Sequence, residues 1–245
     1  MRNIKLTIEY DGKEFNGWQK QPNKLNIQGT IEQAIKLITG EEVELNASGR
    51  TDAGVHAIGQ VANFKTNSQI PIEKFAIAIN SKLKRSIVIK KAEEVGERFH
   101  SRLNCKKKTY RYIINNSEEG TAIYRNLETH IPQKLNIEKM KQAVKYFEGE
   151  HDFKAFKASG TSSKSSVRTI YEANVNQEGQ KIIIELTGNG FLYNMVRIIA
   201  GTLVEVGMEK IEPEKIPEII ENKKRENAGK TLPPNGLYLV NVEYW

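Results

Sequence analysis

The chain has 245 residues, with 37 lysines and arginines against 30 acidic residues, and so carries a formal net charge of +7. This length can bury a substantial core as one large or two small domains, and the single cysteine, Cys105, excludes a disulfide framework or a cysteine-based zinc site within one chain. No apolar stretch approaches the ~20 residues that span a bilayer. The sequence predicts a protein without a membrane segment, whose positive charge suits a polyanionic partner.

The first hundred residues predict a unit of strands and two helices. Residues 4–10 alternate between apolar and polar side chains, as a strand with one buried face does. Thr30 and Gln33 form a capping box that predicts the start of a helix, which Gly40 ends. Pro71 opens a second helix. Further strands are expected over residues 42–48, 59–65 and 86–91.

The pattern restarts near residue 105. Residues 110–114 alternate like a strand, and Asn136 caps a helix. Later in the chain we expect strands over 167–176, 181–187 and 237–244, and a helix over about 192–207. The sequence therefore predicts two α+β domains of similar plan, 1–105 and 106–245, with a cleft between them where a site is favoured.

The acidic residues are 27 glutamates and only three aspartates, at positions 11, 52 and 152. Asp52 lies in the segment GRTDAGVHA, between two predicted strands, and glycines at 49 and 54 allow the backbone to turn tightly there. A lone aspartate can act as nucleophile or base if it stays ionised, and a nearby cation lowers its pKa. Arg50 is one candidate for that cation, unless it points at a phosphate. The alternative is an ordinary hairpin loop in which Asp52 caps its own backbone.

Two further segments combine cations with apolar or aromatic residues. KKKTYRY, residues 106–112, suits single-stranded or splayed RNA, where bases stack and phosphates pair, although a solvated strand end has the same composition. In GNGFLYNMVR, residues 188–197, Arg197 stands beside the apolar stripe of a predicted helix. A buried arginine needs a carboxylate, for which Asp52 is the candidate; otherwise Arg197 reaches solvent. A third basic run is Lys223-Lys224-Arg225.

Motifs for other chemistries are missing from the sequence. It contains no GxxxxGK[ST] phosphate loop, no HExxH and no GxSxG, and its four histidines are scattered. We therefore expect neither a metal site nor a nucleotide cofactor.

Several segments resemble the tRNA pseudouridine synthase A family. GRTDAGVHAIGQVANF looks like the family signature, and GNGFLYNMVRIIAGTLVEVG is a second specific match. Weaker family-like segments follow in family order: YDGKEFNGWQKQPN, IQGTIEQAI, FHSR, KKTYRY, HDFKAF, SSVRTI and LPPNGLYL. The resemblance runs from Tyr10 to Tyr244. It departs from the family at Ser101, Leu103 and Leu232, where Ala, an aromatic residue and Ala are usual.

The resemblance implies an isomerase that converts uridine to pseudouridine in the anticodon arm of tRNA, at positions 38, 39 and 40. It implies catalysis without cofactor or metal, a homodimer, a cytoplasmic location and no membrane partner. The implied fold is α+β, with two similar halves of RRM or ferredoxin-like type whose antiparallel sheets join around a central active-site cleft.

The resemblance also assigns roles. Asp52 would be the catalytic nucleophile or base, and attack on C1′, attack on C6 and removal of a C2′ proton all remain open. Tyr110 would stack on the uracil, and Arg197 would pair with Asp52 and keep it ionised. Arg50 would fill the space left by the flipped nucleotide, whose extrusion costs a few kcal/mol. The other expected substrate-binding residues are His56 and Gln60. Lysine-rich segments would track phosphates, so that tRNA binding weakens with salt.

Two other interpretations stay open at this point. One is a synthase of the same family that acts on another RNA site. The other is an RNA-binding module without catalysis, although such a module has no need of a glycine-flanked aspartate beside an arginine, and the RNP1 pattern is missing.

Overall fold

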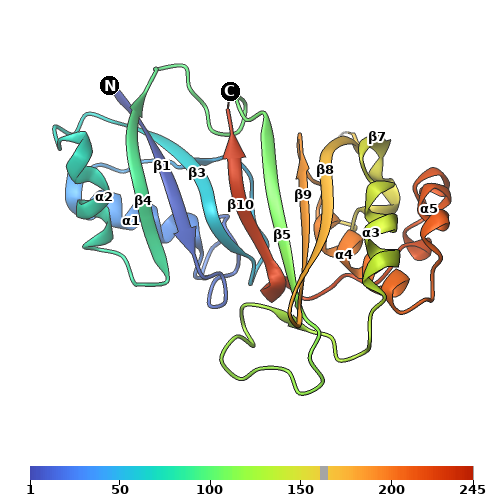
Figure 1. Ribbon diagram of the computed structural model, residues 1–245. Coiled ribbons are helices and arrows are strands. Elements are labelled where there is room, and N and C mark those ends of the chain that lie inside the picture. The colour runs from blue at the N-terminus through green and yellow to red at the C-terminus, as the bar shows by residue number, and fades with distance from the viewer. Residues whose placement is uncertain (161–164, 245) are drawn as a thin grey trace. The chain divides into compact units, whose positions relative to one another are not determined.

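The computed structural model describes residues 1–160 and 165–244. In this part of the chain the fold is mixed α+β, with mostly antiparallel strand pairing and five α-helices (Figure 1). The chain divides into two compact units. The first comprises Met1–Lys106 together with the last residues from Tyr238 on, and the second comprises Lys107–Leu237. No helix in the described ranges is both long and apolar enough to cross a membrane.

The first unit is built on a sheet with strand order β4-β1-β3. Its elements in chain order are β1 (Arg2–Tyr10), α1 (Ile27–Thr39), β2 (Asn46–Ala47), β3 (His56–Thr66), α2 (Ile72–Asn80) and β4 (Ile87–Val95). Pairing of β1 with β3 and with β4 is antiparallel. Two other strands also pair with β3: β2 runs antiparallel to it, and β10 (Leu237–Glu243) runs parallel, with Tyr238 opposite His56.

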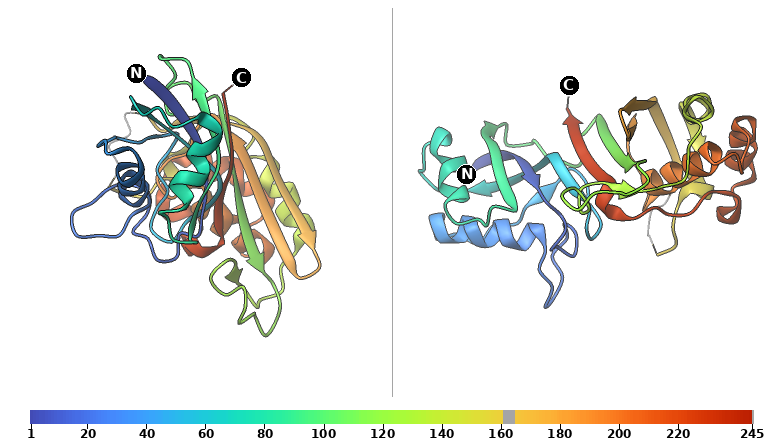
Figure 2. Two further views of the ribbon diagram at one scale, coloured as in Figure 1. Left: turned by 90° about the vertical axis from the view of Figure 1, so that its left-hand side faces the viewer. Right: turned by 60° about the horizontal axis from the view of Figure 1, so that its bottom comes forward.

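One face of this sheet forms the core of the first unit. The alternating residues Ile4, Leu6 and Ile8 are fully buried, as the period-two pattern predicts. The helices α1 and α2 lie on one side of the sheet (Figures 1 and 2). Phe75 of α2 packs edge-on against Phe64 of β3, with ring centroids 6.2 Å apart, so helix and strand share one apolar layer.

The predicted capping box at Thr30 is wrong, because helix α1 begins earlier. Asn26 is the N-cap, and its Oδ1 accepts a hydrogen bond of 2.8 Å from the Gly29 amide. The Thr30 hydroxyl instead donates back to the Asn26 carbonyl at 2.7 Å, inside the first turn. The end of the helix is confirmed: Gly40 adopts a left-handed φ of 74° and its amide bonds to the Lys36 carbonyl.

The strand expected over residues 42–48 is also largely wrong, since only Asn46–Ala47 pairs with β3. Glu41, just before this segment, accepts hydrogen bonds from the Asn67 amide and the Thr66 hydroxyl. Its carboxylate therefore fastens the segment to the end of β3 through a side chain, a contact that a propensity pattern does not reveal.

The second unit has the strand order β5-β9-β8-β7, with β6 parallel to the edge of β5. Its elements are β5 (Lys107–Asn115), β6 (Thr129–His130), α3 (Ile137–Lys145), β7 (Gly149–Asp152), β8 (Val167–Glu178), β9 (Lys181–Gly188), α4 (Met195–Gly207) and α5 (Ile216–Asn222). The N-cap at Asn136 is confirmed, because its Oδ1 accepts from the Lys139 amide at 3.2 Å. The helices α3 and α4 lie side by side near the sheet (Figure 2).

Helix α4 begins at Met195, three residues later than the sequence predicts, and is buried along most of its length. Gly201 in its middle faces the backbone of Lys230 so closely that a Cβ there would stand 1.8 Å from the Lys230 carbonyl oxygen. A glycine in a helix interior usually costs stability. Here it permits a helix-to-backbone contact that no side chain would allow.

Candidate active site

The loop that carries Asp52 connects β2 to β3 in the first unit. It turns tightly: the Val55 amide donates to the Asp52 carbonyl at 3.1 Å, and Gly54 adopts a φ of 78° that favours glycine. Asp52 itself is partly exposed and Arg50 is exposed. The two residues that the sequence singles out for chemistry therefore lie at the outer side of a structured turn.

Buried contacts anchor the residue directly before Asp52. The Thr51 hydroxyl lies 2.7 Å from the phenol oxygen of Tyr10, and the Thr51 carbonyl accepts from the Trp18 amide at 3.0 Å. Gly17 lets the Trp18 segment approach this closely, because it has a φ of 84° and a Cβ there would lie 2.6 Å from the Thr51 carbonyl oxygen. Burial raises the pKa of Tyr10 to about 12, so its hydroxyl stays neutral at physiological pH.

Gln60, in β3, bonds to the start of the same loop. Its side chain is fully buried; Oε1 accepts from the Ser48 hydroxyl at 2.7 Å and Nε2 donates to the Gly49 carbonyl at 2.9 Å. Nε2 also lies 3.4 Å from the Tyr10 phenol oxygen. The buried side-chain amide of Gln60 therefore connects the start of the loop, at Ser48 and Gly49, to Tyr10 of β1. The sequence pattern does not indicate this structural role.

His56 lies at the end of the loop, with only 1% of its surface exposed. Its Nδ1 lies 3.1 Å from the Gly12 amide and 3.1 Å from a carboxylate oxygen of Asp11. The neutral ring accepts from Gly12 through Nδ1, whereas a protonated ring would donate to Asp11. The ring also stacks on Tyr238 of β10, with centroids 4.9 Å apart. His56 thus ties three segments of the first unit together.

Tyr110 lies in β5 of the second unit, where it is opposite Leu186 of β9. Its ring meets the ring of Phe191 edge-on, with centroids 5.0 Å apart and an angle of 76°, and 8% of the residue is exposed. The predicted aromatic residue therefore packs against a second aromatic ring, which comes from the segment that leads into α4.

Arg197 lies in the first turns of α4 and is partly buried. Its Nε donates to the Leu232 carbonyl at 2.6 Å, and one of its terminal nitrogens donates to Oδ1 of Asn194 at 2.8 Å. These two bonds fix the guanidinium within the second unit. Asp52 belongs to the first unit, and the pairing of Asp52 with Arg197 stays a prediction.

The other two aspartates have local structural roles. Asp11 accepts from the Lys13 amide at 2.9 Å, two residues further along the chain. Asp152 caps a short 3₁₀ turn, and the Ser166 hydroxyl and the Lys223 ammonium lower the pKa of this carboxyl. Two of the three aspartates therefore accept hydrogen bonds from backbone amides two residues further along the chain.

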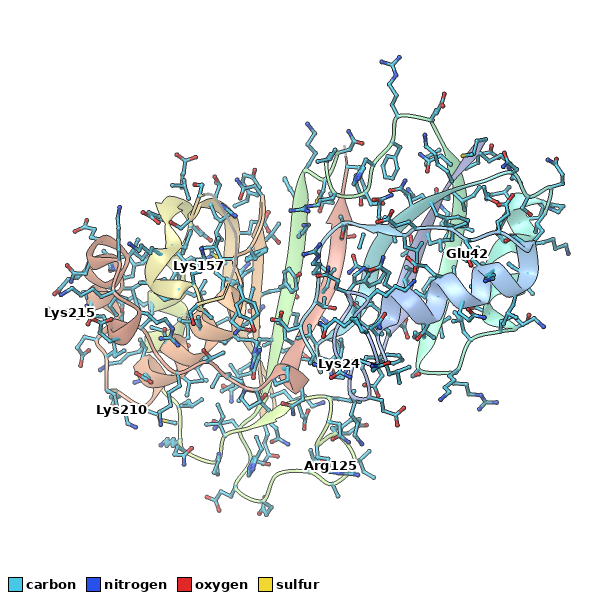
Figure 3. All side chains as sticks on the ribbon, turned by 180° about the vertical axis from the view of Figure 1, so that it is seen from behind. Lys24, Glu42, Arg125, Lys157, Lys210 and Lys215 are labelled. Atoms are coloured by element: carbon cyan, nitrogen blue, oxygen red, sulfur yellow. The ribbon has the colours of Figure 1, made fainter. Side chains whose placement is uncertain are left out.

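Basic side chains are distributed over both units. In the second unit Lys210 and Lys215 project outward (Figure 3). In the basic β5 segment the Lys107 ammonium lies 5.3 Å from the ring centre of Tyr171, which is 44% exposed. Tyr171 lies outside residues 106–112, so this contact does not test the expected binding of RNA by that segment.

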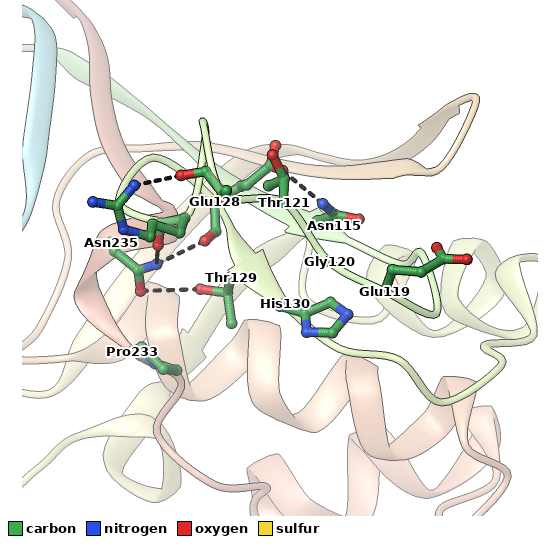
Figure 4. A pocket seen from close by; sticks show the side chains of 11 residues that line it. Asn115, Glu119, Gly120, Thr121, Glu128, Thr129, His130, Pro233 and Asn235 are labelled. Atoms are coloured by element: carbon green, nitrogen blue, oxygen red, sulfur yellow. Dashed lines mark hydrogen bonds between the residues drawn. The ribbon is translucent and has the colours of Figure 1, made fainter.

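The second unit also has a polar cavity of about 480 Å³ (Figure 4). Its lining residues include Asn115, Arg125, Glu128, Thr129 and Asn235. Glu128 is 3% exposed, and its carboxylate accepts from the Asn115 amide at 2.7 Å and pairs with the Lys181 ammonium at 3.1 Å. None of the predicted site residues lines this cavity.

The comparisons with known proteins agree on one family. A family model described as tRNA pseudouridine synthase matches residues 6–104 and 143–245. The tRNA pseudouridine synthase A of Caldicellulosiruptor saccharolyticus is 55% identical and that of Acetivibrio thermocellus 54% identical, each over 244 residues and the full length of both chains. The tRNA pseudouridine synthase A 2 of Clostridium perfringens is 54% identical over the same length.

The family model matches most of the chain, and the relatives match it from end to end. The chain therefore belongs to the tRNA pseudouridine synthase family, whose members are isomerases that convert uridine to pseudouridine in tRNA.

Proposed function

We propose that this isomerase acts on uridines 38, 39 and 40 in the anticodon arm of tRNA, with Asp52 as its reacting carboxylate. The observation that carries the proposal is the support of the Asp52 loop: Thr51 is anchored by Tyr10, and Gly49 by Gln60, while Asp52 stays partly exposed. A reacting group needs such a fixed but accessible position, because small displacements reduce the rate strongly.

The reaction needs little machinery. The N1–C1′ glycosidic bond breaks, the uracil turns, and a C5–C1′ bond forms; C5 then loses its proton and N1 gains one, so atoms and electrons balance without a co-reactant. One carboxylate and a confining pocket can serve this chemistry. Attack of Asp52 on C1′, attack on C6 and removal of the C2′ proton each use the same side chain.

Two residues of the second unit complete the proposed site. Arg197 would pair with Asp52 and keep the carboxylate ionised, since a nearby opposite charge favours the charged form. Tyr110 would stack on the uracil, and its edge-on contact with Phe191 supports this role by holding the ring in one orientation.

The remaining predicted residues receive different tasks. Arg50 is exposed and would fill the space that the flipped nucleotide leaves. His56 and Gln60 are buried, so their proposed contribution to substrate binding is to hold the loop, through Gly12 and Gly49 respectively. Lysines of segments 106–108 and 223–225 would follow the phosphates, which makes tRNA binding salt-dependent.

We also propose that the two domains expected from the sequence, 1–105 and 106–245, are similar RRM or ferredoxin-like halves whose sheets join around the active-site cleft, although the residues from Tyr238 on pack with the first unit. The order β1-α1-β2-β3-α2-β4 in the first unit supports this proposal, and the second unit has the order β5-β6-α3-β7-β8-β9-α4, in which the short strands β6 and β7 are additional. The protein would work in the cytoplasm as a homodimer, without cofactor or metal.

The deciding experiment is release of tritium from tRNA labelled at C5 of uridine, with wild type and Asp52→Asn compared. The C5 hydrogen must leave when the new C–C bond forms, so wild type should release tritium and the variant should not. Mapping of pseudouridine in the product tRNA then tests positions 38, 39 and 40. Release by both proteins would move the chemistry away from Asp52, and modification elsewhere would favour a synthase for another RNA site. Binding without release would favour a non-catalytic module.

A further inference from the structure

Asn194, the residue before helix α4, has an unusual backbone conformation. Its φ of 58° and ψ of 9° lie in the left-handed region, which L-amino acids other than glycine, asparagine and aspartate rarely adopt. An asparagine at an N-cap normally takes an extended backbone and accepts a hydrogen bond from a helix amide with its side chain. Asn194 makes no such capping bond. Its side chain instead bonds to another group.

The partner of the Asn194 side chain is Arg197. Oδ1 of Asn194 accepts a bond of 2.8 Å from a terminal nitrogen of the guanidinium, three residues further along the chain. The Leu232 carbonyl accepts from Nε at 2.6 Å. Two acceptors on neighbouring nitrogens of a planar group determine both its position and the direction of its plane.

The second acceptor is itself held in place. Leu232 is followed by Pro233, whose carbonyl accepts from the Tyr112 phenol at 2.7 Å. Asn235 donates to the Glu128 carbonyl at 2.7 Å, and this asparagine lies beside Thr129 and Pro233 at the cavity (Figure 4). The segment that carries the Leu232 carbonyl is therefore tied to β5 and to the loop before β6. Of these two acceptors, one is a backbone carbonyl and the other belongs to the side chain of Asn194, which a substitution can remove.

We propose that Asn194 is a positioning residue for the isomerisation: its carboxamide fixes the direction in which Arg197 presents its remaining donors to the reacting carboxylate. This rests on the proposed pairing of Arg197 with Asp52. The left-handed backbone is the means, because it turns Oδ1 away from the helix amides and toward the guanidinium.

The test uses Asn194→Gly, which keeps the left-handed conformation without strain and removes only the acceptor. Because hydrogen bonds to charged groups are stronger than those between neutral groups, kcat should fall roughly 10- to 100-fold, with little change in KM for tRNA. The acidic limb of the kcat profile should move to higher pH, since a misdirected Arg197 no longer keeps the carboxylate ionised. Asn23→Gly is the matched control, because Asn23 has a φ of 57° and lies on an exposed loop.

A double-mutant cycle separates positioning from a general structural effect. If Asn194 acts through the guanidinium, Asn194→Gly should cost less than about twofold in the Arg197→Lys background. An unchanged kcat, a fall in kcat without a shift of the acidic limb, or full additivity in the cycle would each overturn the proposal. Failure of the proposed function is a different result: Asp52→Asn would then release tritium at the wild-type rate, whatever Asn194 does.

Discussion

The phenol oxygen of Tyr10 lies 2.7 Å from the hydroxyl of Thr51, and the two residues are 41 positions apart in the sequence. Both groups are buried, and the residue after Thr51 is Asp52. A strand in the middle of the first sheet thereby sets the position of the loop that carries the proposed reacting carboxylate.

Tyr10→Phe tests this relationship. The change keeps the ring and removes the hydroxyl, which leaves the Thr51 hydroxyl without this partner. We expect a loss of about 1–2 kcal/mol in the free energy of unfolding and a lower kcat, because the loop gains freedom next to Asp52. Denaturant unfolding and tritium release measure the two effects. Equal activity of variant and wild type would show that the bond serves stability alone.

The same phenol should make stability fall in alkali. Burial raises the pKa of Tyr10 to about 12, against about 10 in the unfolded chain. Its contribution is therefore fully present below pH 10, and is lost as the pH rises through 10 to 12, where the unfolded state gives up the proton first. Unfolding midpoints measured across this range should fall with pH, and less steeply in Tyr10→Phe. Burial also raises the pKa of Tyr112 and Tyr244, so the decline should be reduced and not abolished.

Arg197→Lys should retain the charge and lose the planar fork. A single ammonium cannot reproduce bonds to the Leu232 carbonyl and to Asn194 while also facing a carboxylate. We expect kcat to fall by about two orders of magnitude or more. The control is Arg125→Lys, on an exposed loop of the same unit. Near-wild-type turnover by Arg197→Lys would remove this residue from the site.

Arg50→Ala should impair nucleotide flipping more than the first binding of tRNA. The side chain is exposed at the start of the Asp52 loop, where a flipped nucleotide would leave a gap to fill. Stopped-flow fluorescence of a base analogue beside the target uridine reports flipping, and a filter-binding titration reports affinity. Arg85→Ala, an exposed arginine elsewhere in the first unit, serves as control. An equal loss in both measurements would make Arg50 a simple phosphate contact.

Gly201→Ala should destabilise the second unit, although alanine is the better helix former by about 1 kcal/mol. The added Cβ would meet the Lys230 carbonyl oxygen at 1.8 Å, so helix or backbone must move. We expect a net loss of at least about 2 kcal/mol in the free energy of unfolding. Gly96→Ala is the control, because a Cβ at Gly96 has no atom within 4 Å. Similar stabilities for the two variants would contradict the close approach of α4 to Lys230.

The sequence predicted those parts of the fold whose causes are local. The caps at Gly40 and Asn136 and the alternation of β1 are examples, since each depends on a few neighbouring residues. Where two local signals compete, prediction failed: Thr30 carries a capping-box pattern, but Asn26, four residues earlier, starts the helix. Helix α5, Ile216–Asn222, was missed because seven residues are too short to show a period.

In the candidate site too, some residues could be predicted from the sequence and others could not. Motif resemblance predicts Asp52, Arg50 and Arg197 as site residues from their places in the sequence. The groups that hold them are invisible there, because their partners are distant: Gln60 supports Gly49 from the next strand, and Leu232 orients Arg197 through a backbone carbonyl that any residue would provide. Asn194 left a trace in the sequence, as an asparagine just before a helix, but only its dihedral angles distinguish it from an ordinary cap.

Strand β10 has a consequence for biosynthesis. Residues from Tyr238 on belong to the first unit, where Tyr238 stacks on His56 at the end of the Asp52 loop. During translation, the ribosome must therefore make the whole second unit before the first can acquire this strand. The loop of Asp52 reaches its final packing only after residue 238 has been made, so a shorter nascent chain lacks the ring of Tyr238 that stacks on His56 beside this loop.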